Sequence, residues 1–203
     1  VWLHACTMET QHRKLSLWLA VYHALMISLI NGLITIPLEL FGRKMNWGVF
    51  LYPLIYITTD FAVRMLGKAA ARDAIKWTWI PSSLITFAEL SLISHEPSTV
   101  AARVAISSGL AYLWPMWLDT AIFGWVRDRV QAWWAPPLVA LVVTVPLQTY
   151  AFYAMAFAWG ENAYMSQHWP EIATSSLMMK SLVMTAMVIP GYGLLLRLFS
   201  ERS

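Results

Sequence analysis

The chain has 203 residues, of which 59% are hydrophobic and only 12% are charged. Soluble globular domains carry about 25% charged residues, so this composition excludes an ordinary soluble domain and a disordered chain. A membrane-spanning helix needs about 20 apolar residues, and the roughly 120 hydrophobic residues are enough for about six such helices. A single cysteine excludes an internal disulfide, and a net charge of only +3 does not suggest nucleic-acid binding.

The first fourteen residues are polar and precede the first long apolar stretch. We expect residues 1–14 to form a cytoplasmic segment. Met8 offers an alternative translation start, so we expect residues 1–7 to be upstream sequence without a role. The apolar stretch that follows is too long for the core of a signal peptide, and no small-residue cleavage site follows it.

Six apolar segments then follow, separated by short turns. They predict helices over 15–36, 47–66, 74–94, 99–126, 134–159 and 171–199. Pro37 directly follows the first segment, where it would end a helix. The sequence therefore predicts an all-α integral membrane protein with six transmembrane helices, forming one domain over 15–199 with a short tail at 200–203.

The basic residues near the predicted span ends indicate the orientation, because cytoplasmic loops carry an excess of Lys and Arg. Ten of them lie on one side of the predicted membrane: Arg13, Lys14, Arg64, Lys68, Arg72, Lys76, Arg127, Arg129, Arg197 and Arg202. Three lie on the other side: Arg43, Lys44 and Arg103. This asymmetry predicts that both termini are cytoplasmic, in a multi-pass protein of the inner membrane.

Polar side chains inside a bilayer are costly and usually face the bundle interior or a cavity. The candidates are His23, Asn31, Asp60, Glu89, Arg103, Asp119, Gln148 and Lys180. No metal-ligand cluster, phosphate-binding loop or nucleophile motif accompanies them. We therefore expect neither an enzyme nor a metal or other cofactor.

Several candidates also have a structural interpretation. Asp60 and Arg64 are i, i+4 neighbours, so they either form a structural pair or leave Asp60 to bind substrate or protons. Arg103 is close enough to the outer interface for its side chain to reach it. A salt bridge between Asp119 and Arg127 is as good an explanation of Asp119 as a function is.

Other candidates favour one interpretation. Lys180 is too deep in its predicted span to reach the interface, so we expect an interior role. Gln148 lies beside Pro146, and helices broken at proline form midplane sites in some transporters. For Glu89 a structural role is favoured, and for His23 a contact between helices.

A series of ordered motifs resembles the queuosine precursor transporter (VUT) family. The most specific stretch is Trp47-Gly48-Val49-Phe50 with Tyr52-Pro53, then Thr59-Asp60, Val63-Arg64, Gly67 and Ala71-Arg72. Further matches are Arg103-Val104-Ala105, Leu118-Asp119, His168-Trp169, Lys180 and Tyr192-Gly193. The resemblance covers residues 14–199. It implies a six-span inner-membrane protein that imports 7-deazaguanines such as 7-cyano-7-deazaguanine.

The chain is a divergent member by this comparison. Pro115-Met116 stand where the family pattern has Gly-Gln, and Val145 and Gln148 stand where it has Asn and Asp. Ser176 replaces an aspartate. These positions lie in the segments expected to line the site, so the resemblance supports transport of a planar heterocycle more firmly than the identity of that heterocycle.

A deazaguanine offers a donor edge, a carbonyl acceptor and two flat faces. Carboxylates, cations, amides and aromatic rings are the complementary groups. We predict substrate binding by Asn31, Asp60, Arg103, Ser107, Gln148, Phe152 and Lys180, with Phe50, Tyr56 and Tyr112 as further stacking candidates. Coupling or gating is predicted for Asp60, Glu89 and Asp119.

The sequence therefore predicts a secondary transporter for a small purine-like compound, a queuosine precursor (7-cyano-7-deazaguanine or its aminomethyl form) by resemblance. The alternative is a substrate-binding membrane subunit of an energy-coupling-factor importer for a vitamin or nucleobase. Ala20 and Ala24 have the small-residue spacing with which such subunits contact a partner. The expected partners are the small molecule and the bilayer, with homo-oligomerisation left open.

Overall fold

The computed structural model describes residues 2–34, 37–40, 43–93, 95, 97–161 and 163–200. For residues 2–12, 31–32, 34, 37–40, 43–46, 49 and 199–200 the description covers the backbone alone. The six helices are α1 (Trp2–Ile34), α2 (Tyr52–Leu66), α3 (Lys68–Leu92), α4 (Ser98–Arg127), α5 (Ala135–Phe157) and α6 (Ala163–Ser200). Between α1 and α2 lie the antiparallel strands β1 (Pro37–Leu40) and β2 (Arg43–Asn46) and a 3₁₀ turn, Trp47–Phe50.

Each of the six predicted segments overlaps one of these helices, so the prediction of a helical chain is confirmed. The strand pair between α1 and α2 was not predicted. Four helix starts also differ: α1 begins at Trp2 and so includes residues predicted as a separate segment, α3 begins at Lys68 rather than near 74, α6 begins at Ala163 rather than near Glu171, and α2 begins later than predicted, at Tyr52. The helices continue through their internal prolines, so α5 is not interrupted at Pro146, where the sequence suggested a broken helix.

Three helices contain a stretch long and apolar enough to cross a membrane. These stretches are Arg13–Ile30 in α1, Ala135–Phe157 in α5 and Ala163–Leu198 in α6. In contrast, α2 has only 15 residues, and α3 and α4 do not meet the same criterion within the described residues. Length and composition thus support three of the six predicted spans.

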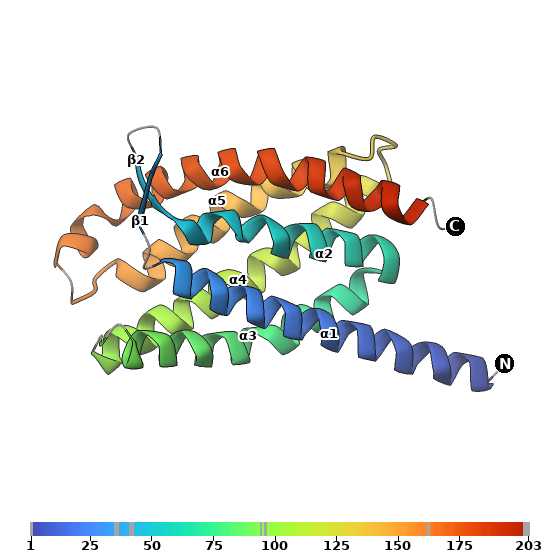
Figure 1. Ribbon diagram of the computed structural model, residues 1–203, viewed down its shortest axis with the longest axis horizontal. Helices are drawn as coiled ribbons and strands as arrows, with labels where there is room; N and C mark the ends of the chain where they lie inside the picture. The colour runs from blue at the N-terminus through green and yellow to red at the C-terminus, as the bar shows by residue number, and fades with distance from the viewer. Residues whose placement is uncertain are drawn as a thin grey trace.

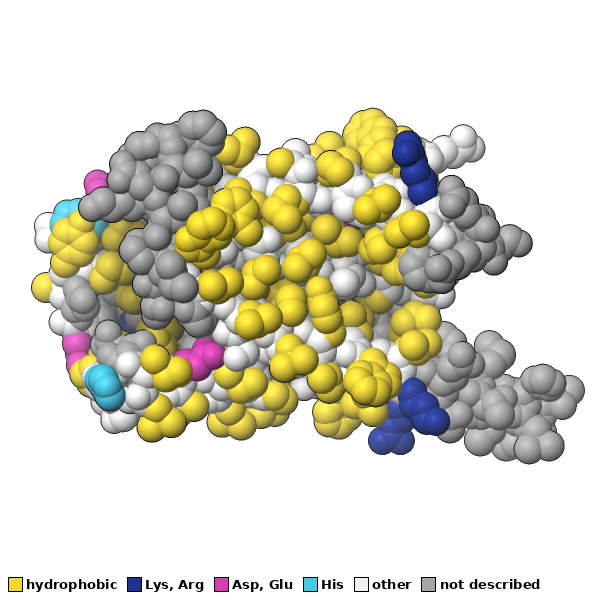
Figure 2. Space-filling model, in the orientation of Figure 1, with side chains coloured by type: hydrophobic (Ala, Val, Ile, Leu, Met, Phe, Trp, Pro, Cys, Tyr) yellow, Lys and Arg dark blue, Asp and Glu magenta, His cyan; other side chains and the backbone are white. Residues whose placement is uncertain are grey.

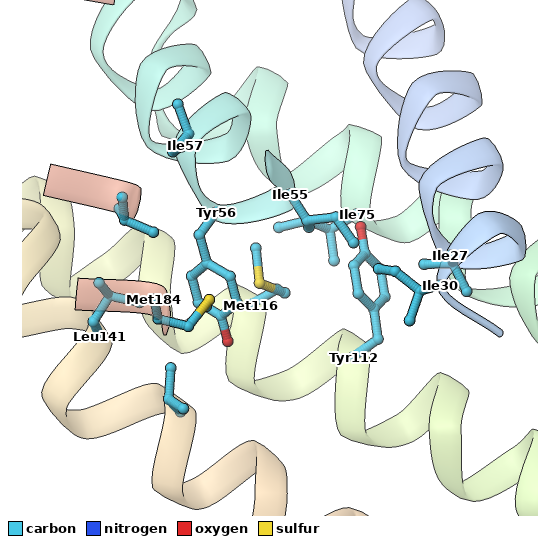
Figure 3. Packing of buried hydrophobic residues seen from close by; sticks show 12 residues of the cluster. Ile27, Ile30, Ile55, Tyr56, Ile57, Ile75, Tyr112, Met116, Leu141 and Met184 are labelled. Carbon is cyan, nitrogen blue, oxygen red and sulfur yellow. The ribbon is translucent and has the colours of Figure 1, made fainter. Parts of the chain in front are cut away.

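The helices pack as a ring in which α2 closes the circle. Going round, α1 contacts α3, α3 contacts α4, α4 contacts α5, and α5 contacts α6, while α2 touches α1, α3, α4 and α6. Both the start of α1 and the end of α6 lie at the same end of this bundle (Figure 1). A buried apolar cluster fills the centre, with Tyr56 reaching down from α2 and Tyr112 reaching up from α4 beside Met116 (Figure 3).

The junction between α2 and α3 turns sharply at Gly67. Its φ of +89° is a conformation that glycine adopts without the penalty that side chains impose there. Arg127 at the end of α4 donates through Nη1 to the carbonyls of Val63 and Arg64 at 3.4 and 3.2 Å. The Val63 carbonyl also accepts from the Gly67 N–H at 3.2 Å, and the Arg127 side chain adds a bond to the Arg64 carbonyl at the end of α2, where carbonyls run out of helical donors.

The outer surface of the bundle is rich in large apolar side chains. Trp18, Leu84 and Val142 are among them, with exposed fractions of 72%, 64% and 67%. Figure 2 shows hydrophobic side chains spread across the middle of one face, with Lys and Arg gathered at the end where α1 starts and α6 ends. A surface of this kind fits contact with lipid better than contact with water.

Candidate functional site

A pocket lies between the helices, and its empty space of about 550 Å³ includes space open to solvent. Every helix of the bundle contributes to its wall, which consists of Ile27, Ile30, Tyr52, Ile55, Tyr56, Ser82, Ser108, Ala111, Tyr112, Met116, Gln148, Phe152 and Lys180. The wall is therefore mainly apolar and aromatic, with a few polar groups.

Two polar contacts define the chemistry of the cavity. The Tyr56 hydroxyl donates to Gln148 Oε1 at 3.0 Å, so the two Nε2 hydrogens are what this amide can offer to a ligand. Lys180 Nζ lies 4.5 Å from the centre of the Tyr52 ring, in a cation–π contact. Both groups are hydrogen-bond donors, and among the described lining residues none is a carboxylate.

The aromatic walls are held by contacts behind them. His23 on α1 is fully buried, and its Nδ1 lies 2.9 Å from the Tyr112 hydroxyl while its Nε2 lies 3.1 Å from Thr58 Oγ1. These bonds tie α1 to α2 and α4 and fix the Tyr112 ring. Phe152 makes an edge contact with Phe157. Flat faces held in this way suit a planar heterocycle.

A second polar layer lies one helical turn from the cavity. Asp60 follows Tyr56 on α2, Asp119 follows Met116 on α4, and Thr144 precedes Gln148 on α5. Because α5 runs opposite to α2 and α4, all three steps lead toward the same end of the bundle. Asp60 is 1% exposed and faces the buried carboxyl group of Asp119, and Thr144 donates to Asp119 Oδ1 at 3.0 Å.

The chain is similar to known transporters along nearly its whole length. Residues 46–194 match the family described as "Putative vitamin uptake transporter". The chain is 32% identical to the "Queuosine precursor transporter" of Escherichia coli K12, over 96% of this chain and 92% of that protein. It belongs to this transporter family. Its members are transporters, not enzymes, and with the apolar helices this makes the chain a membrane protein.

Two further relatives agree with this assignment. A "Probable queuosine precursor transporter" of Haemophilus influenzae is 25% identical over 96% of this chain and 92% of that protein. A protein of the same name from Bacillus subtilis is 27% identical over 70% of this chain and 68% of its own length. No solved structure matches the chain.

The structure places three residues predicted to bind substrate on the cavity wall of this family member: Gln148, Phe152 and Lys180. The stacking candidates Tyr56 and Tyr112 also line it. Phe50 lies elsewhere, 5.7 Å from the ring of Trp47. Asn31 belongs to α1, but its side chain is outside the described part of the chain.

Arg103 and Ser107 are not among the described lining residues. Arg103 donates through Nε to the Met155 carbonyl at 2.9 Å and through Nη2 to the Ala158 carbonyl, so it caps the end of α5. The Ser107 hydroxyl bonds to the carbonyl of Arg103 within α4 at 2.7 Å. Ser108, one position along, faces the cavity instead.

The predicted structural pair of Asp60 and Arg64 does not form. Arg64 Nη1 donates to the Tyr192 hydroxyl of α6 at 3.3 Å, and Asp60 turns toward α4. The salt bridge suggested between Asp119 and Arg127 is also absent, since Arg127 bonds to the carbonyls of Val63 and Arg64 and Asp119 accepts from Thr144. Both expectations relied on spacing within one helix, and partners on other helices replaced them.

Glu89 is separate from both polar layers. Its Oε1 accepts a hydrogen bond from Ser28 of α1 at 3.0 Å, so it links α3 to α1. Ala20 also faces α3, because its carbonyl accepts from the Thr78 hydroxyl at 3.3 Å. Ala20 is therefore used inside the bundle, which removes its support for a partner-binding stripe.

Sequence reasoning missed Tyr52, Ser82 and Ser108 as parts of the wall. Tyr52 belongs to a sequence motif, but nothing in the sequence indicates that its ring lies next to the Lys180 ammonium group. The described residues also contain no group of acidic, histidine or cysteine side chains suited to a metal ion. Donors, hydroxyls and aromatic faces are thus the means by which this site can hold a ligand.

Proposed function

We propose that the protein is a secondary transporter that imports a queuosine precursor, 7-cyano-7-deazaguanine or its aminomethyl form, across the inner membrane. In this proposal all six helices cross the membrane. Both ends of the chain are cytoplasmic, as the basic residues at that end of the bundle suggest. The names of the relatives support the choice of substrate, and the shape and chemistry of the cavity support it independently.

The observation that carries the proposal is the pairing of donors with aromatic walls in one cavity. The ring carbonyl of a deazaguanine would accept from Gln148 Nε2 or from the Lys180 ammonium group. Tyr52, Tyr56, Tyr112 and Phe152 supply rings next to its flat faces. The hydroxyls of Ser82 and Ser108 would accept from its ring N–H and amino groups.

The absence of a carboxylate from the described wall indicates which charge and which hydrogen-bonding groups the substrate has. A purine-like compound with acceptors at its periphery suits two donors, whereas a cationic vitamin would meet Lys180 unfavourably. Gln148, where the family pattern has an aspartate, keeps hydrogen-bonding capacity without charge. This favours a neutral heterocycle bound mainly through its carbonyl and its faces.

The test is uptake by the purified chain in liposomes, without ATP and without any added protein. Labelled 7-cyano-7-deazaguanine should enter the liposomes and exchange with unlabelled compound inside. Guanosine should compete poorly, because it carries a ribose in addition to its bicyclic base. Phe152→Ala should weaken binding, and Trp18→Ala, on the outer surface, serves as its control. Folded protein that binds none of the labelled compound at micromolar concentration would refute the substrate. Uptake only with a partner ATPase would favour the importer subunit.

A further inference from the structure

We propose that Asp60 and Asp119 form a proton-binding site that couples substrate uptake to the proton gradient. This inference rests on the proposed function, because it concerns the energy source of the same transport. The two carboxyl groups come from α2 and α4, one turn toward the cytoplasmic end from the cavity. They are distinct from the groups that would hold the substrate.

The first observation is the isolation of the two carboxyl groups. Asp60 is 1% exposed and Asp119 is 0% exposed. Neither oxygen of Asp60, nor Oδ2 of Asp119, receives a hydrogen bond from a protein donor in the described part of the chain. Asp60 instead faces the Asp119 carboxyl group, and a hydrogen bond between two carboxyl groups requires one proton.

The second observation is the set of groups that surround the pair. Every helix packed around Asp60 and Asp119 contributes a polar side chain that faces the pair or the residues next to it. The titratable and charged ones are His23 of α1, Tyr56 and Arg64 of α2, Arg72 of α3, Arg127 of α4 and Tyr192 of α6. From α5 the group is the Thr144 hydroxyl.

None of these cations neutralises the pair. Arg64 is bonded to Tyr192, Arg127 to carbonyls at the end of α2, and Arg72 to the Thr120 hydroxyl at 3.2 Å. A proton is therefore the positive charge that the layer can take up.

The position of the pair links the proton to the substrate. Tyr56 and Gln148 bond to each other on the cavity wall. On α2, Tyr56 lies one turn from Asp60, and on α5, Gln148 lies one turn from Thr144, which donates to Asp119. With one proton bound, the pair holds α2 and α4 together beneath the cavity. Without it, two carboxylates would face each other in a site that water does not reach, and their repulsion would separate these helices.

One cycle then moves one proton and one substrate molecule in the same direction. The proton enters from outside onto the pair while the cavity is occupied. It leaves to the cytoplasm as α2 and α4 separate and the substrate is released. No other reactant is consumed, and no covalent bond other than O–H is made or broken.

The experiment uses the full chain in liposomes with the membrane potential clamped at zero. A pH difference of about one unit, acid outside, should drive about tenfold accumulation of 7-cyano-7-deazaguanine in the wild type. Asp60→Asn and Asp119→Asn should still exchange labelled for unlabelled compound but should accumulate none. The matched control is Asp128→Asn, the same change at an exposed carboxylate near the cytoplasmic end, which should accumulate like the wild type.

Each other result overturns the inference. Accumulation that follows a sodium gradient, that persists in both pair variants, or that is lost in Glu89→Gln instead, would assign coupling elsewhere. If a pair variant does not fold, a pH dye inside wild-type liposomes decides, since uptake must acidify the lumen. A wild type that exchanges the compound but ignores the pH difference refutes the proton site alone. A wild type that neither binds nor exchanges it refutes the proposed function as well.

Discussion

Replacing Lys180 by Met should lower ligand affinity without lowering stability. The side chain is 8% exposed, and in the described part of the chain no carboxylate pairs with it. Its cation–π contact with Tyr52 is worth about 0.5–2 kcal/mol, less than the several kcal/mol that burying an ammonium group costs. Methionine fills similar space without that cost, so the melting temperature should hold or rise.

Ligand affinity should fall in Lys180→Met, although the melting temperature does not. A hydrogen bond from a charged donor to the ligand contributes about 1.5–3 kcal/mol, so its loss should raise the Kd about 10–150-fold. Binding of labelled 7-cyano-7-deazaguanine in detergent gives the Kd, and tryptophan fluorescence during heating gives the melting temperature. Lys76→Met, at an exposed lysine of α3, is the control. A Kd within about twofold of wild type, or a melting temperature that falls along with affinity, would refute this account of Lys180.

Four further predictions test other parts of the structure. Arg103→Gln should lower the free energy of unfolding by about 1–3 kcal/mol in denaturant titration but leave the Kd within about twofold, because this side chain caps α5. Tyr56→Phe should raise the Kd about 2–10-fold by releasing Gln148, with a melting temperature close to wild type. The aminomethyl compound should bind about tenfold more weakly than the nitrile in competition assays, because the cavity holds a lysine and, among its described lining residues, no carboxylate. In a cysteine-free background, an impermeant maleimide should label Thr99→Cys in intact cells and Asp128→Cys only after lysis.

The positions of the helices were predictable because the information is local. Apolar segments and the turn residues between them marked the place of each helix, and the ends of the helices more closely than their starts. Pro37 lies just beyond the end of α1, as a helix-ending proline should. The strand pair was not predictable in this way, because each strand has only four residues, too short for a pattern of alternation to stand out. The early start of α1 escaped prediction as well, since polarity excludes residues from a membrane but not from a helix.

The partners of the polar residues were less predictable than their burial. Depth within an apolar segment correctly indicated that Asp60, Asp119, Gln148 and Lys180 are buried. It did not indicate which helix each would face. For Arg64, the local i, i+4 spacing suggested a carboxylate, but the actual partner is a hydroxyl 128 positions away.

The same limit applies to the carboxylate predicted at the site. Asp60 was the natural choice to accept the donor edge of a deazaguanine, because it is the acidic residue of the most specific motif. In the structure, one helical turn separates Tyr56, on the cavity wall, from Asp60, in the second polar layer. Of the two residues, only Tyr56 lines the cavity. A shift of one helical turn therefore moves Asp60 from the wall, where it could bind substrate, to the layer where we propose that it binds a proton.

This separation bears on the direction of coupling. If one carboxylate bound both the substrate and the proton, the two would compete, and their exchange would favour movement in opposite directions. In the proposed mechanism Gln148 and Lys180 on the cavity wall would bind the substrate while Asp60 and Asp119 would hold the proton one turn away, so both sites could be filled at once. Because α2, α4 and α5 carry residues of both layers, a movement that opens one layer displaces the other. Simultaneous occupancy on shared helices is the arrangement that cotransport in one direction requires.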